Sequence, residues 1–335
     1  MIEASIRHVE AGGDLSMEQM SEAIGRMMQG SCEDAEIAQL LLALSRKGES
    51  VAEVAGAAMA MRRQMTPIRS NRTDVLDTCG TGGDGSRTFN ISTAAAIVTA
   101  AAGVPVAKHG NVGISSRSGS ADVLAALGVR IDADAARVEA CLEELGICFC
   151  YAPVLHGSMR HVAAVRKRLG VPTIFNILGP LANPAGAPFQ LLGVGRSPFQ
   201  PLMAQALNLL GTRRALVVRG GDGLDEVTLA DVTHVVEVRG GTTREHDWEP
   251  ADFGLPRASL DTLRVDGPEQ SAAMIRGIFA GRPGPGRDIV VANAAAGLWT
   301  VGRSADLSEC ARRAAEAIDS GAAAGLLARL AEFMR

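Results

Sequence analysis

The 335-residue sequence is poor in aromatic side chains, which make up 3% of it, and it has no excess of basic residues. Its 33 lysines and arginines stand against 37 acidic residues, which gives a formal net charge of −4. Duplex-binding proteins normally carry a basic excess, and single strands are held on stacked aromatic rings. We therefore expect no nucleic-acid partner, and any bound anion must be held by a local site.

Cysteine pairs and long apolar runs are also missing. No Cys-x-x-Cys spacing occurs among the six cysteines, which argues against a zinc framework or a disulfide scaffold. The longest apolar run, 94–106, is interrupted by Thr99, Gly103 and Pro105 and is too short to span a bilayer. Because the N-terminus also lacks a signal-peptide pattern, we expect a soluble, cytoplasmic protein without a membrane partner.

Hydrophobic residues make up 47% of the chain, enough for a large buried core. Residues 1–70 show only helical periodicity, with a helix-start signal at Ser16 and Gln19. From residue 74 on, short apolar strands alternate with helical stretches. The expected strands lie at 75–77, 104–107, 147–151, 191–194, 215–218 and 289–292. This pattern predicts an α/β protein with a mostly parallel central sheet.

The helical leader is long enough to form a small domain of its own. We expect a small all-helical domain over 1–70, with a returning segment near 170–190, and a large α/β domain over 71–335. The stretch 173–188 is expected to be a loop or crossover, because Gly179-Pro180 and Asn183-Pro184 interrupt it.

A glycine-rich segment, Asp77-Thr-Cys-Gly-Thr-Gly-Gly-Asp-Gly85, follows the first expected strand and leads into a helix near Ser92. Glycines allow backbone N–H groups to converge on an anion, and the N-terminus of the following helix adds its dipole. Asn90 or Ser92 is expected to cap that helix. A tight strand–helix turn is the alternative, but four glycines exceed what a turn needs. The segment lacks the lysine of a nucleotide P-loop, so it predicts another kind of anion site.

A second polar segment follows the next strand. It begins with Lys108-His109-Gly110-Asn111 and continues with the serine-rich stretch 115–122. Lys108 is placed at the carboxyl end of a strand, where ligands collect in open α/β sheets. A solvated strand end is the alternative for Lys108, and a structural hydrogen bond is the alternative for His109. Two such loops side by side predict a ligand with two separated phosphate groups.

Two further charged features have both a structural and a functional interpretation. Asp225 and Glu226 follow the apolar strand 215–218, and paired acids in a phosphate-binding chain suggest Mg²⁺, although a turn would also explain them. Arg166 lies on a basic helical face that is either solvated or in contact with a ligand. No activated serine, cysteine or metal-bound water is evident. We therefore expect catalysis by positioning and charge stabilisation, with no single certain catalytic residue.

Taken together, these motifs resemble anthranilate phosphoribosyltransferases, and the resemblance covers almost the whole chain. The motifs that carry it are Gly80-Thr-Gly-Gly-Asp84, Asn90-Ile-Ser-Thr93, Lys108-His-Gly-Asn111, Ser118-Gly-Ser-Ala-Asp122, the stretch from Phe175 to Pro184, and Asp225-Glu226. The resemblance implies the nucleoside phosphorylase-like phosphoribosyltransferase fold. It also implies transfer of phosphoribosyl from phosphoribosyl pyrophosphate to the amine of anthranilate, a step of tryptophan biosynthesis, and a homodimer formed through the helical domain.

The same resemblance implies the site residues. Contacts to phosphoribosyl pyrophosphate are implied for Gly80, Gly83, Asp84, Thr88, Asn90, Ile91, Ser92, Thr93, Lys108, His109, Gly110, Asn111, Val112, Gly113, Ile114, Ser115, Ser116 and Ser120. The implied Mg²⁺ positions are Ser92, Asp225 and Glu226, and the implied anthranilate contacts are Gly80, Asn111, Arg166, His156 and Gly179. Charge stabilisation is expected from Lys108, Asp84 and Mg²⁺.

The sequence departs from the family pattern at two places. Val112-Gly113 stands where an arginine and a small residue are usual, which removes a phosphate contact, and Gly157 replaces a proline.

Two other functions remain open. A pyrimidine nucleoside phosphorylase would share the fold but would need phosphate and no acid pair. A non-catalytic nucleic-acid-binding relative would need a basic surface, which the net charge opposes.

Overall fold

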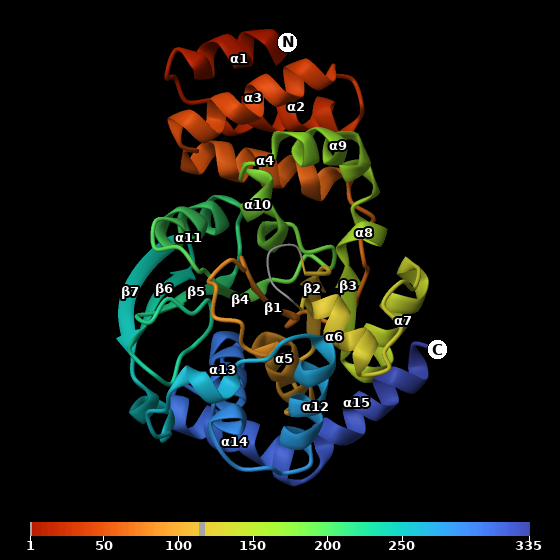
Figure 1. Cartoon of the computed structure of the whole chain (residues 1–335), viewed down its shortest axis with the longest axis vertical. Coiled ribbons are helices and arrows are strands. Elements are labelled where there is room, and N and C mark those ends of the chain that lie inside the picture. The colour runs from red at the N-terminus through yellow and green to blue at the C-terminus, as the bar shows by residue number, and fades with distance from the viewer. Residues whose placement is uncertain (1, 114–117) are drawn as a thin grey trace.

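The computed structural model describes residues 2–113 and 118–335 and consists of a helical layer above a seven-stranded sheet (Figure 1). The helical layer begins with four helices: α1 (Ile2–Glu10), α2 (Met17–Met28), α3 (Asp34–Lys47) and α4 (Val51–Gln64). Ser16 and Gln19 form the capping box that starts α2, which confirms the start signal in the sequence.

A later part of the chain returns to this layer. It contains α8 (Ala152–Leu155), α9 (Arg160–Leu169) and α10 (Phe175–Leu178), and α9 packs on α2 and α3. One buried apolar cluster runs from the first helices through Ile177 to Leu192 and Val217 on the sheet. Because this core is continuous, the helical layer is packed directly onto the α/β part of the molecule.

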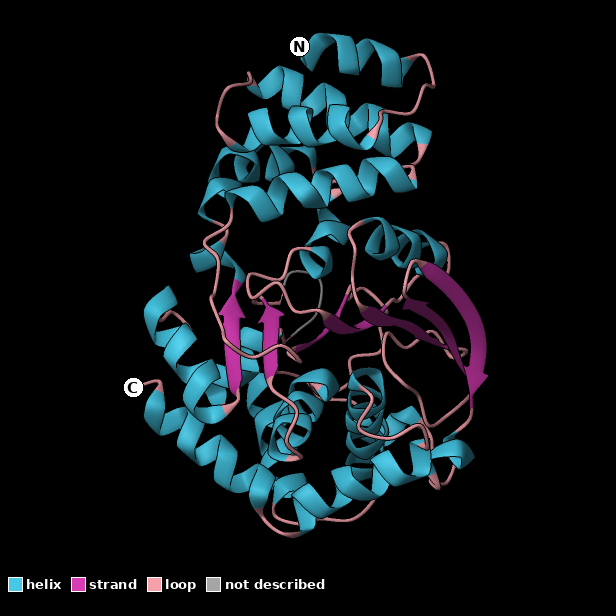
Figure 2. Ribbon diagram, turned by 180° about the vertical axis from the view of Figure 1, so that it is seen from behind, coloured by secondary structure: helices cyan, strands magenta, loops and turns pink. Residues whose placement is uncertain are grey.

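The sheet has the strand order β3-β2-β1-β4-β5-β6-β7. Its strands are β1 (Leu76–Gly80), β2 (Val106–Gly110), β3 (Ile147–Tyr151), β4 (Phe189–Gly193), β5 (Arg214–Gly220), β6 (Thr233–Arg239) and β7 (Thr242–Trp248). The first five strands in the spatial order are parallel. β6 pairs with β5 in antiparallel orientation, and β7 pairs with β6 in the same way. The parallel strands direct their carboxyl ends toward the helical layer (Figure 2). The predicted fold class, a helical domain with a mostly parallel α/β domain, is confirmed.

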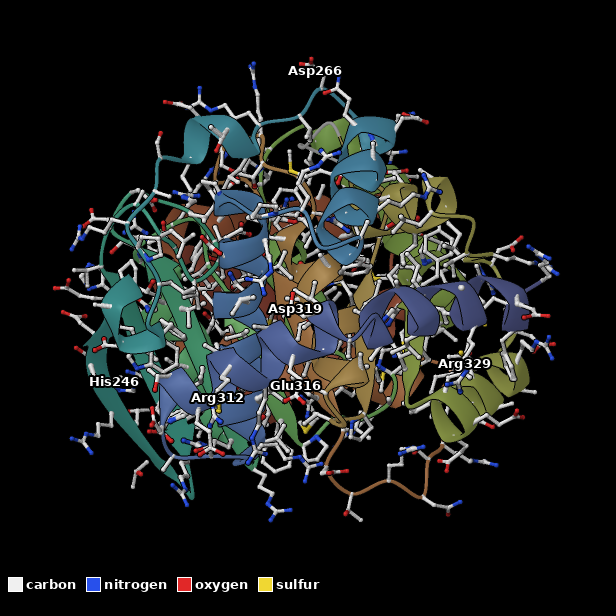
Figure 3. All side chains as sticks on the ribbon, turned by 90° about the horizontal axis from the view of Figure 1, so that it is seen from below. His246, Asp266, Arg312, Glu316, Asp319 and Arg329 are labelled. Carbon is white, nitrogen blue, oxygen red and sulfur yellow. The ribbon has the colours of Figure 1, made fainter. Side chains whose placement is uncertain are left out.

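Helices cover both faces of the sheet. They are α5 (Ile91–Ala101), α6 (Ser120–Ala126), α7 (Ala135–Leu145), α11 (Phe199–Leu209), α12 (Pro268–Phe279), α13 (Pro285–Val301), α14 (Leu307–Asp319) and α15 (Ala322–Phe333). Helices α12 to α15 form the layer farthest from α1 (Figure 1). Seen from below, this layer carries charged side chains such as Arg312, Glu316 and Asp319 on α14 (Figure 3).

The expected strand at 289–292 is wrong, because these residues lie inside α13. The helix is buried on nearly all sides over Ile289–Leu298 and packs on α5 and α14, so its apolar run has no helical periodicity. A short continuous apolar run cannot be assigned to strand or helix by periodicity alone.

The hairpin β6–β7 was not predicted, since β7 is mostly exposed and polar. No helix in the described ranges 2–113 and 118–335 is long and apolar enough to cross a membrane.

Candidate active site

The glycine-rich loop between β1 and α5 lies beside the acid pair that follows β5. The backbone N–H of Gly82 donates to Asp225 Oδ2 at 2.8 Å, and Thr81 N–H donates to the carbonyl of Gly193. A side chain at Gly193 would place its Cβ 1.6 Å from the Asp225 carbonyl oxygen, and one at Gly80 would lie 2.4 Å from Asp225 Oδ2. Glycine is therefore required at Gly193, where the end of β4 meets the backbone of the loop after β5, and Gly80 leaves room for the Asp225 carboxylate.

The carboxylates of Asp84, Asp225 and Glu226 lie close to one another beside the glycine-rich loop. The pKa of Asp225 is raised to about 7, mainly by burial and to a lesser extent by the charge of Asp84. The pKa of Glu226 is raised to about 8, mainly by burial and to a lesser extent by the charge of Asp225. Asp84 Oδ2 is buried and has no hydrogen-bond donor among the described residues. A hard cation would stabilise the ionised form of these three acids. No three acidic, histidine or cysteine side chains in the described part of the chain are close enough to hold a metal alone.

Lys108 is the cation next to this acid set. It is buried on β2, and its ammonium donates to the carbonyl of Thr78 at 2.5 Å and to Ser92 Oγ at 3.1 Å. Ser92 also donates its backbone N–H to Glu226 Oε1 at 3.0 Å, so Ser92 joins the lysine to the acid pair. Burial lowers the pKa of Lys108, and the nearby carboxylates of Asp77, Glu226 and Asp225 oppose that shift. The solvated alternative for Lys108 is wrong.

Asn90 connects the two loops. It is the N-cap residue of α5, but its side chain makes no capping bond, contrary to the expectation from the sequence. Its Oδ1 accepts from Ser118 Oγ and Ser271 Oγ, both at 2.9 Å, and its backbone N–H donates to Ser271 Oγ at 2.9 Å. Ser271, fully buried on α12, was not predicted because no local motif marks it. The Asn90 side chain therefore holds the second loop against the first.

The second loop is closed by Asp122 of α6. Its Oδ2 accepts from the backbone N–H groups of Gly113 and Gly119, each at 2.8 Å. Asn111 uses its own side chain to accept from Val112 N–H, and Val112 itself is exposed. Ile114, Ser115 and Ser116, which the family resemblance assigns to the donor site, lie outside the described residues.

The opposite face of β2 carries neutral groups. His109 lies next to Lys108 on the strand, but its Nδ1 lies 3.1 Å from the carbonyl of Gly179, and its Nε2 lies 3.2 Å from Nε2 of His156. A carbonyl only accepts, so Nδ1 of His109 carries the proton and Nε2 accepts from His156. Burial lowers the pKa of His109 to about 4; burial, and then His109, lower the pKa of His156 to about 3. Both rings are therefore neutral near pH 7.

Arg166 of α9 projects from the helical layer. Its guanidinium lies 5.2 Å from the centre of the Phe175 ring, and burial lowers its pKa. No hydrogen bond or ion pair within the described ranges joins this guanidinium to Asn111 or Gly80. The structure thus places Gly80, Asp84, Asn90, Ser92, Lys108, Asp225 and Glu226 in one cluster and His109, His156 and Gly179 in a second. Among the described residues, Arg166 has no hydrogen bond or ion pair to either cluster.

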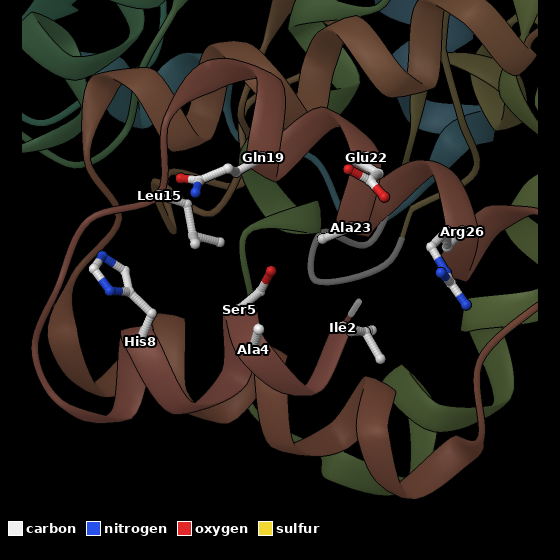
Figure 4. A pocket seen from close by; sticks show the side chains of 9 residues that line it. All are labelled: Ile2, Ala4, Ser5, His8, Leu15, Gln19, Glu22, Ala23 and Arg26. Atoms are coloured by element: carbon white, nitrogen blue, oxygen red, sulfur yellow. The ribbon is translucent and has the colours of Figure 1, made fainter.

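Two cavities lie away from the strand ends. One of about 400 Å³ lies between α1 and α2 and is lined by apolar side chains together with His8, Glu22 and Arg26 (Figure 4). The other, of about 250 Å³, is bounded by Arg62, Asp77, Pro180 and Gln190 among others. Neither contains Lys108, Asp225 or Glu226 in its lining.

Comparisons with known proteins match both parts of the chain. A model of the glycosyl transferase family's helical bundle domain matches residues 4–65, and one of its a/b domain matches residues 72–324. The anthranilate phosphoribosyltransferase of Rhodopirellula baltica is 52% identical over 98% of this chain and 96% of the relative. That of Rhodospirillum rubrum is 51% identical over 98% of this chain and 94% of the relative.

Solved structures give the same result. The crystal structure of anthranilate phosphoribosyltransferase from Thermus thermophilus is similar with a TM-score of 0.93 and 45% identity, covering 98% of this chain and 99% of that chain. The enzyme from Saccharomyces cerevisiae, in complex with PRPP and Mg, is similar with a TM-score of 0.89 and 28% identity, covering 99% and 98%.

Proposed function

The chain belongs to this glycosyl transferase family and, within it, to the anthranilate phosphoribosyltransferases. We propose that it transfers the phosphoribosyl group of phosphoribosyl pyrophosphate to the amine of anthranilate, giving N-(5-phosphoribosyl)anthranilate and pyrophosphate. The observation that carries this proposal is the cluster in which Lys108, the glycine-rich loop and Asp225-Glu226 meet at the strand ends. The reaction is a transferase step of tryptophan biosynthesis.

The donor is bound, in this proposal, by the two loops after β1 and β2. The glycine-rich loop has left-handed backbone at Gly82, Gly83 and Gly85, and the N-terminus of α5 follows it. Such backbone presents N–H groups to phosphate oxygens, and Lys108 supplies a fixed positive charge. The Asn90–Ser118 contact sets the distance between the loops, as a ligand with two separated phosphate groups requires.

Magnesium is the cofactor that we propose beside the acid pair. Asp225, Glu226 and the hydroxyl of Ser92 are hard oxygen donors, and burial together with neighbouring carboxylates raises the pKa of both acids, which a bound cation would oppose. Since the described residues hold no complete metal site, substrate oxygens and water would supply the other ligands. When bound, Mg²⁺ neutralises charge on the departing pyrophosphate.

Anthranilate is placed, in this proposal, on the His109 side of β2. His156 and Gly179 form a neutral wall there, and Arg166 is the cation available for the anthranilate carboxylate. Gly80 and Asn111 are the remaining contacts that we assign to it. Two neutral histidines suit an acceptor that must keep its amine uncharged in order to attack.

The mechanism that fits these residues is dissociative. Positive charge builds at the ribose C1 carbon as pyrophosphate departs, while Lys108 and the loop N–H groups stabilise the leaving oxygens. The aromatic amine of anthranilate is neutral near pH 7, so its attack needs no strong base. The chain therefore contributes orientation and charge stabilisation.

The test is the loss of anthranilate fluorescence with phosphoribosyl pyrophosphate and Mg²⁺ added together or withheld in turn. Loss that requires both supports the transferase and its metal; loss without Mg²⁺ supports the transferase alone. No loss by folded protein, with phosphate-dependent cleavage of a pyrimidine nucleoside instead, would identify the phosphorylase. Binding of nucleic acid without either activity would identify the non-catalytic relative.

Three further proposals concern the domain limits, the oligomeric state and the location of the protein. We propose a helical domain over 1–70 with a returning segment near 170–190, an α/β domain over 71–335, and a homodimer through the helical domain. The packing of α9, residues 160–169, on α2 and α3 supports a return of the chain to the helical domain, although α9 ends just before the proposed segment. The homodimer follows the family resemblance, and light scattering would test it. All six cysteines are free thiols, which is typical of a reducing compartment and supports a cytoplasmic location.

A further inference from the structure

Asp77, on β1, is a buried carboxylate that the proposed function does not use. It has no exposed surface (0%), and its side chain lies on the His109 side of the sheet. Its Oδ1 accepts from the backbone N–H of His109 at 3.1 Å, and its Oδ2 accepts from Nε2 of Gln190 at 3.3 Å. We infer that Asp77 is a positioning residue for the anthranilate side of the site, an inference that rests on the proposed function.

Two routes lead from Asp77 to the same short segment. The first passes through His109, whose ring bonds to the carbonyl of Gly179. The second passes through Gln190, whose amide donates to the carbonyl of Pro180 at 2.6 Å. Adjacent carbonyls of the Gly179-Pro180 segment are therefore tied to one carboxylate. This segment also follows α10, so Asp77 links the sheet to the returning part of the helical layer.

The hydrogen bonds on the donor side do not pass through this link. Lys108 has its own hydrogen bonds to Thr78 and Ser92, on the opposite face of β2. Successive residues of a strand project to opposite faces, so a change behind His109 leaves the Lys108 contacts in place. Asp77→Asn removes one of the charges near Lys108 but none of its hydrogen bonds, so its larger effect should fall on anthranilate and not on phosphoribosyl pyrophosphate.

A carboxylate is needed because both of its oxygens face donors. An asparagine of the same shape has one oxygen and one NH₂ group, so it must direct a donor at either His109 N–H or Gln190 Nε2. One buried link then breaks. The cavity of about 250 Å³ beside Asp77, Pro180 and Gln190 gives the released segment space to move.

The experiment compares Asp77→Asn and Gln190→Leu with Gln200→Leu. Gln200 is a matched control, because it is a buried amide that, like Gln190, donates to two oxygen atoms, here the carbonyls of Val217 and His234, but it lies on α11. We expect Asp77→Asn to raise the anthranilate KM about tenfold, with the phosphoribosyl pyrophosphate KM and kcat within about twofold of wild type. Gln190→Leu should shift the same constant in the same direction, and Gln200→Leu should shift neither KM.

Equal effects on both substrates, or no effect of Asp77→Asn on the anthranilate KM, would overturn the inference. If Asp77→Asn does not fold, the comparison of Gln190→Leu with Gln200→Leu decides the question alone, since equal kinetic constants for these two would also overturn it. Calorimetric titration of each variant with anthranilate gives a readout independent of turnover. A wild-type protein that consumes no anthranilate would instead contradict the proposed function.

Discussion

The two faces of β2 differ in their electrostatics although they are one residue apart. Lys108 faces α5 and the Asp225-Glu226 pair, whereas His109 faces a second neutral histidine and backbone carbonyls, with the buried carboxylate of Asp77 behind it. The charged face suits a pyrophosphate with its cation, and the neutral face suits an aromatic amine. Alternation along a single strand thus separates the two proposed substrates with no additional element between them.

The largest effect should come from removing the cation of the charged face. Lys108→Met deletes the buried ammonium, and we expect kcat/KM to fall by about 10²–10³-fold because the leaving group loses a preorganised charge. Steady-state kinetics would measure this. Lys167→Met is the matched control, since Lys167 is exposed on α9, and it should behave as wild type. A Lys108→Met enzyme with near-normal kcat/KM would remove Lys108 from the mechanism.

Arg166→Ala tests the other side of the comparison. The loss of a cation for the anthranilate carboxylate should raise the anthranilate KM by about 10–100-fold while the donor KM changes little. The exposed Arg160 of the same helix provides the control variant Arg160→Ala. Equal increases in both KM values would contradict the assignment of Arg166 to the neutral face.

Ser271→Ala should have a smaller effect, confined to the charged face. The change removes the hydroxyl that holds Asn90 from α12, so the donor KM is expected to rise about fivefold. The anthranilate KM should stay constant. Ser271→Ala kinetics indistinguishable from wild type would mean that Ser118 alone positions Asn90.

The smallest effect is a difference in pH dependence between the faces. The raised pKa values of Asp225 and Glu226, about 7 and about 8, mean that metal-free protein loses stability as pH rises from the ordinary carboxyl range, about 4, up to about 8. The lowered pKa values of His109 and His156, about 4 and about 3, mean that stability is lost as pH falls below about 6.5. The acid and histidine slopes have opposite signs and overlap below about pH 6.5, so thermal unfolding should show the acid slope alone between about pH 6.5 and 8. Glu226→Gln should flatten that slope; a profile that Glu226→Gln leaves unchanged there would contradict this assignment.

The sequence predicted the elements whose patterns are local. The capping box at Ser16, the parallel strands before residue 220 and the glycine-rich loop all follow from neighbouring residues. Patterns that depend on distant packing were not predictable. Residues 289–292 form a helix because α5 and α14 surround them, and β7 is a strand because β6 pairs with it, despite an exposed polar sequence.

The candidate site likewise has one part that the sequence predicts and another that depends on distant packing. The sequence alone determined which residue types stand after each strand: glycines, a lysine, a histidine and paired acids, which together indicate an anion and a cation. Only the tertiary structure decided that the Asn90 side chain bonds to Ser118 and Ser271 instead of capping its helix, and that Asp77 reaches Gln190. The physical reason is that these hydrogen bonds join residues up to 181 positions apart, and local spacing carries no information about such partners.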